Sequence, residues 1–130
     1  MEKYLSVRGD CVTEKTIEKS VFITSSRHVE SEEEARAFIA EVCAKYSDAT
    51  HNCYAFIPDM FGNSPRFSDD NEPQGTAGMP ILEVIKNRGL TQIAVVVTRY
   101  FGGIKLGAGG LVRAYSGCAA ENLASARAVL

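Results

Sequence analysis

The residue types best suited to chemistry lie between Arg99 and Arg113, in the stretch RYFGGIKLGAGGLVR. Five glycines and three cations occur within these fifteen residues. Glycine leaves its backbone N–H unshielded, and the N-terminus of a helix favours an anion. The stretch therefore predicts an anion or RNA site, and its candidate ligands are Arg99, Lys105, Gly107, Gly109, Gly110 and Arg113.

Two known phosphate-binding motifs do not fit this stretch. A P-loop needs Lys and then Ser or Thr where Ala108 and Gly109 stand. A dinucleotide fingerprint needs Gly or Ala where Val112 stands. A purely structural interpretation also remains open, in which the glycine pairs at 102–103 and 109–110 provide positive φ and close packing of a helix on a strand.

An acidic stretch, SDDNEP, supplies three carboxylates, those of Asp69, Asp70 and Glu72. Carboxylates at close spacing are used to bind divalent cations. The stretch matches no EF-hand loop, and Asp and Asn are ordinary turn residues that bond their own backbone. We expect a solvated or arginine-paired turn and no metal site, with Arg99 as the first partner to examine.

Evidence for catalysis is weak in this sequence. His51 and Cys53 are two residues apart on a predicted strand and face the same way. A Cys-His pair needs an exposed thiol and an orienting group, whereas apolar neighbours here favour a core thiol and a hydrogen-bonded imidazole. There is no G-x-S-x-G or H-E-x-x-H motif. We therefore expect no catalytic residue and no cofactor, and favour a protein that is not an enzyme.

A stacking surface is a further alternative. Tyr100 and Phe101 stand beside Arg99 and Lys105, a combination that suits single-stranded nucleic acid. An aromatic pair at the end of a buried strand also occurs as ordinary packing. Both interpretations remain open at this point.

The elements that would position these residues are visible in the hydrophobic pattern. The run IAVVVT at 93–98 predicts a central strand covered on both faces. A helix should follow, with one apolar side formed by Ala108, Val112, Tyr115, Ala119, Leu123 and Ala126. Ser31 and Glu34 predict a capping box before a helix that continues to about residue 46.

The remaining elements complete an α+β order. Strands are expected at 3–8, within 10–29, in the segment 51–59 that Pro58 and Asp59 stop, and near 66–68, and a second helix from about 76 or 79 to 88, ended by Gly89. This order predicts a two-layer sandwich, a mixed β-sheet with helices on one face. The run at 93–98 is too apolar for a strand with one wet face, unless a helix, a partner or a continuation of the chain covers it.

Composition and charge limit the class of protein. The 130 residues are 45% apolar and 23% charged, which predicts one globular domain. No apolar stretch approaches about 20 residues and no signal peptide is recognisable, so we expect a cytoplasmic protein without a membrane contact. The four cysteines form no C-x-x-C pair and are expected to be reduced thiols.

The net charge of −2 argues against generic binding to nucleic acid, but the charge is unevenly distributed. Residues 84–120 contain five basic and no acidic residues, so the rest of the chain sums to −7. The glycine-rich stretch lies inside the basic segment. A local anion site is therefore compatible with the acidic total.

Three segments resemble a known family: ATHNCYAF at 49–56, SDDNEPQGTAGMPIL at 68–82 and VVVTRYFGGIKLGAGGLVRAYS at 95–116. They resemble the IMPACT family, the bacterial YigZ-like proteins and their eukaryotic relatives, and KSVFI at 19–23 is similar to the family's entry strand. The resemblance implies the fold of the second domain of ribosomal protein S-five. It identifies residues 1–130 as a single N-terminal domain of the bacterial branch, without the ferredoxin-like C-terminal domain that bacterial members usually carry.

The resemblance also implies a role in translational control, where the eukaryotic relatives act through a ribosome-associated protein. Our leading hypothesis is a non-enzymatic binding module that contacts RNA or a ribosome-associated protein through the basic glycine-rich loop. The alternative is a phosphate- or nucleotide-binding enzyme, acting on a small molecule with magnesium held by Asp69 or Asp70. The oligomeric state does not follow from the sequence.

Overall fold

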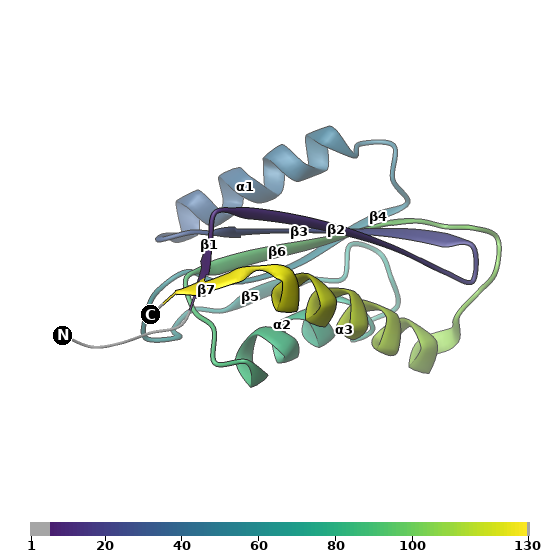
Figure 1. The fold of residues 1–130 in the computed structure, drawn as a ribbon. Helices are drawn as coiled ribbons and strands as arrows, with labels where there is room; N and C mark the ends of the chain where they lie inside the picture. The colour runs from purple at the N-terminus through teal and green to yellow at the C-terminus, as the bar shows by residue number, and fades with distance from the viewer. Residues whose placement is uncertain (1–5, 130) are drawn as a thin grey trace.

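A five-stranded antiparallel sheet with helices on both faces forms the body of the domain (Figure 1). The computed structural model describes residues 6–129, so residues 3–5 of the first predicted strand lie outside the described part. The elements are β1 (Ser6–Arg8), β2 (Asp10–Ile17), β3 (Ser20–His28), α1 (Glu32–Lys45), β4 (His51–Ile57), β5 (Arg66–Ser68), α2 (Gly78–Asn87), β6 (Ile93–Tyr100), α3 (Gly107–Ser125) and β7 (Arg127–Val129).

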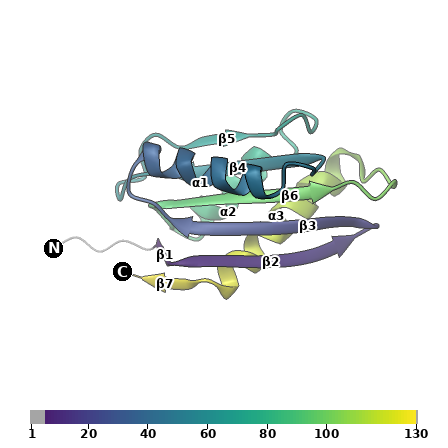
Figure 2. The same cartoon turned by 90° about the horizontal axis from the view of Figure 1, so that it is seen from above.

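The strand order is β2-β3-β6-β4-β5, and every neighbouring pair is antiparallel. The prediction of a mixed sheet is therefore wrong. A helical crossover such as β3-α1-β4 normally joins parallel neighbours. Here β6 lies between β3 and β4 and pairs antiparallel with both, so no parallel pair forms (Figure 2).

The helices cover both faces of the sheet, so the prediction of two layers with helices on one face is wrong. Ala94 and Val96 of β6 pack with Phe38 of α1 on one face. On the other face, Val95 packs under α2 and α3 together with Ile93 and Val97 of the same strand. The central strand is thus covered on both faces, as its uninterrupted apolar run predicted. The α+β class is confirmed.

Local sequence signals account for the helix ends. Ser31 caps α1 by accepting the Glu34 N–H at 3.0 Å, as predicted. The return contact differs from a capping box, because the Glu34 carboxylate accepts the N–H of Glu30 at 3.3 Å. Gly89 follows α2 with φ +67°, which glycine adopts without strain.

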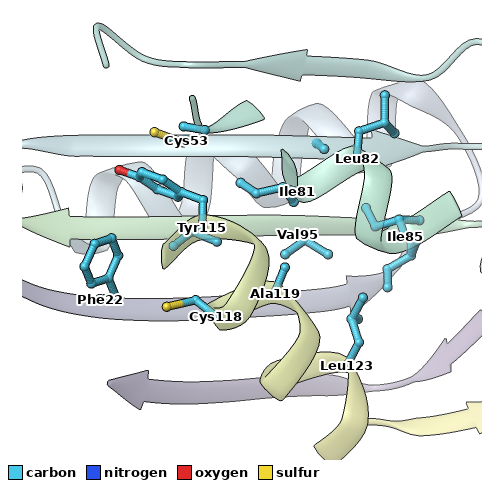
Figure 3. Packing of buried hydrophobic residues seen from close by; sticks show 14 of the residues in the cluster. Phe22, Cys53, Ile81, Leu82, Ile85, Val95, Tyr115, Cys118, Ala119 and Leu123 are labelled. Atoms are coloured by element: carbon cyan, nitrogen blue, oxygen red, sulfur yellow. The ribbon is translucent and has the colours of Figure 1, made fainter. Parts of the chain in front are cut away.

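The larger core lies between the sheet and helices α2 and α3 (Figure 3). Tyr115 of α3 meets the Phe22 ring edge-on at a centroid distance of 5.4 Å. The predicted apolar side of α3 is confirmed at Tyr115, Ala119 and Leu123, but Ala108 and Val112 are exposed, Leu111 is buried instead, and Ala126 is partly buried just after the helix. Within residues 6–129, no helix has the length and apolar character needed to cross a bilayer.

Candidate functional site

The predicted anion stretch forms the loop from β6 to α3 and the first turn of α3 (Figure 1). A Cβ at Gly102 would lie 2.0 Å from the carbonyl oxygen of Lys19, in the β2–β3 turn. Gly103 has φ +92°, a conformation that favours glycine. Positive φ and close packing are thus confirmed for this first glycine pair, but the packing is against the β2–β3 turn and not of a helix on a strand.

The second group of glycines lies inside the first turn of α3. The N-cap residue, Leu106, provides no side-chain capping bond, and the first turn contains no acidic residue. With this N-cap, the N–H groups of Leu106, Gly107, Ala108 and Gly109 have no partner within the helix. The N–H groups of Gly107 and Gly109 therefore have no acceptor within the helix, whereas the N–H of Gly110 is the first that can donate inside it, and ligand binding by these glycines stays a prediction. Neither Gly109 nor Gly110 has a positive φ.

Two of the predicted cations are exposed beside this turn. Lys105 belongs to the loop, and Arg113 lies one turn further along α3. Neither forms an ion pair within residues 6–129. Lys105 lines two cavities of about 380 and 410 Å³, and Arg113 lines the second of these together with Glu18. Positive charge and unpaired N–H groups thus occur together on one surface.

Arg99, the third predicted cation, is buried beneath this surface and is 4% exposed. Its Nη1 donates to Glu72 at 2.9 Å and its Nε to Ser20 at 3.2 Å. Its guanidinium carbon lies 5.6 Å from the ring centroid of Phe22 and 5.2 Å from that of Phe101. The predicted pairing of the acidic stretch with Arg99 is confirmed, so the charge of this arginine is already matched.

Glu72, in the acidic stretch, contacts α3 and lines the smaller of these two cavities, the one of about 380 Å³. One carboxylate oxygen accepts from Arg99 and from the Tyr115 hydroxyl. The other lies 3.4 Å from Nε2 of His51. Burial, and next the neighbouring Cys53 and Glu72, raise the pKa of Tyr115 far above its usual range. The phenol therefore stays protonated and donates to Glu72.

Asp69 and Asp70 use their carboxylates to hold the backbone. The Asp69 carboxylate accepts from three N–H groups, those of Gly75, Ala77 and Gly78, at 2.8 to 3.2 Å. The Asp70 carboxylate accepts the N–H of Asn52 at 2.6 Å. These bonds close the acidic loop and cap the start of α2, which the sequence analysis did not anticipate. Among residues 6–129, no group of three or more His, Cys, Asp or Glu side chains is placed to hold a metal.

His51 and Cys53 do not form a nucleophilic pair. Cys53 is fully buried, with its sulfur 3.1 Å from the Asp69 carbonyl oxygen. Burial raises the pKa of this thiol far above its usual range, so it remains protonated. His51 has Nδ1 2.9 Å from the Asp70 carbonyl, which can only accept, so Nδ1 carries the proton. The core thiol and hydrogen-bonded imidazole favoured by the sequence are confirmed.

The smaller cavity brings the acidic and glycine stretches together. Its polar lining comes from His51, Glu72 and Arg99, and Lys105 adds a further cation. Apolar lining comes from Pro73, Phe101, Leu106 and Leu111, and the remaining lining residues are Thr50, Gly107 and Ala108. This shared cavity was not predicted from the sequence, although the expected contact of Arg99 with the acidic stretch was a signal for it.

The two aromatic residues at the end of β6, Tyr100 and Phe101, have different surroundings. Phe101 is 45% exposed and lines the smaller cavity. The hydroxyl of Tyr100 donates to Asp48, in the connection between α1 and β4, at 2.7 Å. Tyr100 does not line the cavity. The two rings therefore do not form a joint stacking platform.

Sequence comparison finds close relatives for most of the chain. The family model described as the Impact N-terminal domain matches residues 18–123. The IMPACT family member YvyE of Bacillus subtilis (strain 168) is 46% identical over 123 residues, which cover 95% of this chain and 57% of the relative. The chain thus spans a little over half the length of the curated relatives that it matches.

Structural comparison supports the same fold. A crystal structure of a hypothetical protein matches with a TM-score of 0.93 and 40% identity, covering 98% of this chain and 63% of that chain. The structure of the two-domain translational regulator Yih1 matches with a TM-score of 0.51 and 23% identity, covering 95% of this chain and 47% of that chain. This second likeness shows the fold alone.

Proposed function

This chain belongs to the Impact N-terminal domain family, and on that premise we propose that it is a non-enzymatic binding module linked to the regulation of translation. The module contacts RNA or a ribosome-associated protein through the first turn of α3. The family membership supports the link to translation, because a protein with the same fold, Yih1, is described as a translational regulator. In this proposal the 130 residues act as a single binding domain.

One observation carries the choice of surface: the start of α3 has no side-chain capping bond and lies beside cations that have no acidic partner among residues 6–129. Four N–H groups, from Leu106 to Gly109, lack acceptors within the helix. Lys105 and Arg113 are exposed and unpaired within the described residues. Phosphate groups satisfy both features, because they accept hydrogen bonds from N–H groups and carry negative charge.

The competing idea of a magnesium-dependent enzyme has less support. The carboxylates of Asp69 and Asp70 already accept backbone N–H groups. The carboxylate of Glu72 is bonded to Arg99 and Tyr115. These three carboxylates are thus engaged within the protein, and Cys53 is protonated and fully buried. We therefore favour the non-enzymatic binding module over the magnesium-dependent enzyme.

Fluorescence anisotropy with a labelled single-stranded RNA tests the proposal. Affinity should fall as salt rises from about 50 to 200 mM, because phosphate contacts release counterions. Lys105→Ala and Arg113→Ala should each weaken binding and reduce the slope of log K against log salt by about 0.7 for each lost phosphate contact. Lys45→Ala is the matched control, since Lys45 is exposed on α1 and lies on the opposite face of the sheet.

The outcomes separate the two kinds of partner. The absence of RNA binding at low salt would eliminate the RNA version of the proposal. A ribosome-associated partner would then appear as co-sedimentation with ribosomes that Lys105→Ala and Arg113→Ala weaken and Lys45→Ala does not. RNA binding that all three substitutions leave unchanged would place the contact outside the first turn of α3.

A further inference from the structure

The cavity of about 380 Å³ beside the first turn of α3 has the size of a small-molecule site, for which about 300 to 1,000 Å³ is typical. We infer that it holds one nucleotide unit, a nucleoside 5′-monophosphate, either free or as the terminal unit of an RNA strand. This inference rests on the proposed function, because it names the chemical unit that the binding module takes.

The lining carries an excess of positive charge. Arg99 and Lys105 are its arginine and lysine, and Glu72 is its acidic residue. Since Arg99 and Glu72 neutralise each other, Lys105 is left to meet an anion. Arg99 is 4% exposed, and its guanidinium donates through Nε to Ser20 and through Nη1 to Glu72.

Backbone donors lie in the same lining. Leu106, Gly107 and Ala108 line the cavity, and the N–H groups of all three have no acceptor within α3. A phosphate that bound these donors would also lie at the positive end of the helix dipole. The anionic group of the ligand is therefore placed at the first turn of α3, beside Lys105.

Apolar residues also line the cavity. These residues are Phe101, Leu106, Leu111 and Pro73. The Phe101 ring is 45% exposed, although the guanidinium of Arg99 packs 5.2 Å from its centroid. An exposed aromatic face is a stacking surface for a nucleobase of any sequence. An apolar ring system and a phosphate are thus both accommodated.

Polar groups remain to meet the heteroatoms of the ring or the ribose. The Thr50 hydroxyl accepts the N–H of Phe101 at 3.0 Å, which leaves its own proton to donate. His51 is held through Nδ1 by the Asp70 carbonyl, and its Nε2 lies 3.4 Å from Glu72. These groups suit a nucleotide better than inorganic phosphate or a plain fatty acid.

Isothermal titration calorimetry with the intact 130-residue chain tests this inference. AMP and UMP should bind at least about tenfold more tightly than inorganic phosphate, the increment expected from one base stacked on an aromatic ring. Ala108→Trp places a large side chain at the exposed cavity lining and should abolish nucleotide binding. Lys45→Ala, on the opposite face, should leave it unchanged.

A second variant covers the case in which Ala108→Trp fails to fold. Phe101→Ala removes a half-exposed ring and should weaken nucleotide binding about tenfold. Nucleotide binding no tighter than that of phosphate, or binding that survives both substitutions, would overturn the inference.

Two RNA arms identify the source of the nucleotide. A single-stranded RNA with a 5′-phosphate that binds about tenfold more tightly than its 5′-hydroxyl form, and competes with AMP, indicates a strand end. Equal binding of the two RNAs together with tight AMP binding indicates a free nucleotide. Salt-dependent RNA binding without any nucleotide binding would overturn this inference alone, whereas nucleotide binding without RNA or ribosome binding would overturn the proposed function alone.

Discussion

Glu72 is the residue on which the geometry of the candidate site depends most directly. Its side chain is nearly inaccessible, and it contacts Arg99 of β6, Tyr115 of α3 and His51 of β4. A buried ion pair is not by itself a large source of stability, because both charges lose their hydration. The removal of one member is costly, however, because it leaves the other charge buried without a partner.

We predict that Glu72→Gln lowers the free energy of unfolding by about 3 kcal/mol, since the guanidinium of Arg99 would lose its counter-charge in the interior. The matched control is Glu83→Gln, which neutralises an exposed carboxylate on α2 and should change the stability by less than about 0.5 kcal/mol. Urea unfolding of the three proteins gives the comparison. Equal midpoints for the two variants would contradict the role assigned to Glu72.

The buried thiols lead to a prediction about pH. Burial raises the pKa of Cys118 from 9.0 to about 11. Because the folded-state pKa is the higher one, the contribution of this group to stability is complete below pH 9 and is lost as the pH rises through 11. The free energy of unfolding should therefore fall between pH 9 and 11, and by less in Cys118→Ala. An identical fall in both proteins would assign the pH dependence to other groups.

At the scale of residues, the sequence allowed some contacts to be predicted and concealed others. The pairing of Arg99 with the acidic stretch followed from a lone cation at the end of an apolar strand. The bonds from Asp69 to the start of α2 did not follow, since they depend on how the loop folds back on itself. The contact of Tyr115 with Glu72 joins residues 43 positions apart and required the tertiary structure.

At the scale of elements, the glycine-rich stretch divides into two parts with different roles. Gly102 and Gly103 belong to a loop that packs on the β2–β3 turn. Gly107 and Gly109 belong to the first turn of α3 and leave its N–H groups accessible. The sequence predicted both roles but did not divide them between the glycines, because the first residue of α3 carries no capping signal.

We predict that Gly102→Ala destabilises the domain by about 1 to 3 kcal/mol, the usual cost of overpacking. The added Cβ would lie 2.0 Å from a backbone oxygen of Lys19, which cannot rotate away. Gly117→Ala is the control within α3, where a Cβ meets nothing within 4 Å and should stabilise the helix by about 0.5 to 1 kcal/mol. Thermal unfolding of both variants should therefore shift in opposite directions, and shifts of the same sign would contradict this assignment.

For the sheet, the hydrophobic pattern predicted the elements but not the order of the strands. Periodicity identified β6 as a strand covered on both faces and placed the helices in the correct order. It did not reveal that β6 would separate β3 from β4, because strand order depends on long-range pairing. With β6 between β3 and β4, α1 covers the second face of the sheet, where Phe38 and Val42 pack against Val96.

At the scale of the whole molecule, fewer of the cations between residues 84 and 120 contribute charge to the candidate site than the sequence suggested. Of the five cations between residues 84 and 120, Lys86 lies in the last turn of α2, Arg88 donates to the Ala120 carbonyl, and Arg99 is paired with Glu72. Lys105 and Arg113 therefore carry the charge at the first turn of α3. This chain spans 57% of its relative YvyE, and the proposed RNA contact belongs to the part described here.

The first turn of α3 can be tested as the binding surface by nuclear magnetic resonance of the ¹⁵N-labelled chain. When a short single-stranded RNA is added at low salt, the largest amide shifts should occur at Gly107, Ala108 and Gly109, whose N–H groups lack partners in the helix. These shifts should shrink as salt is raised. An unperturbed first turn, with the changes concentrated on α1 across the sheet, would contradict the account.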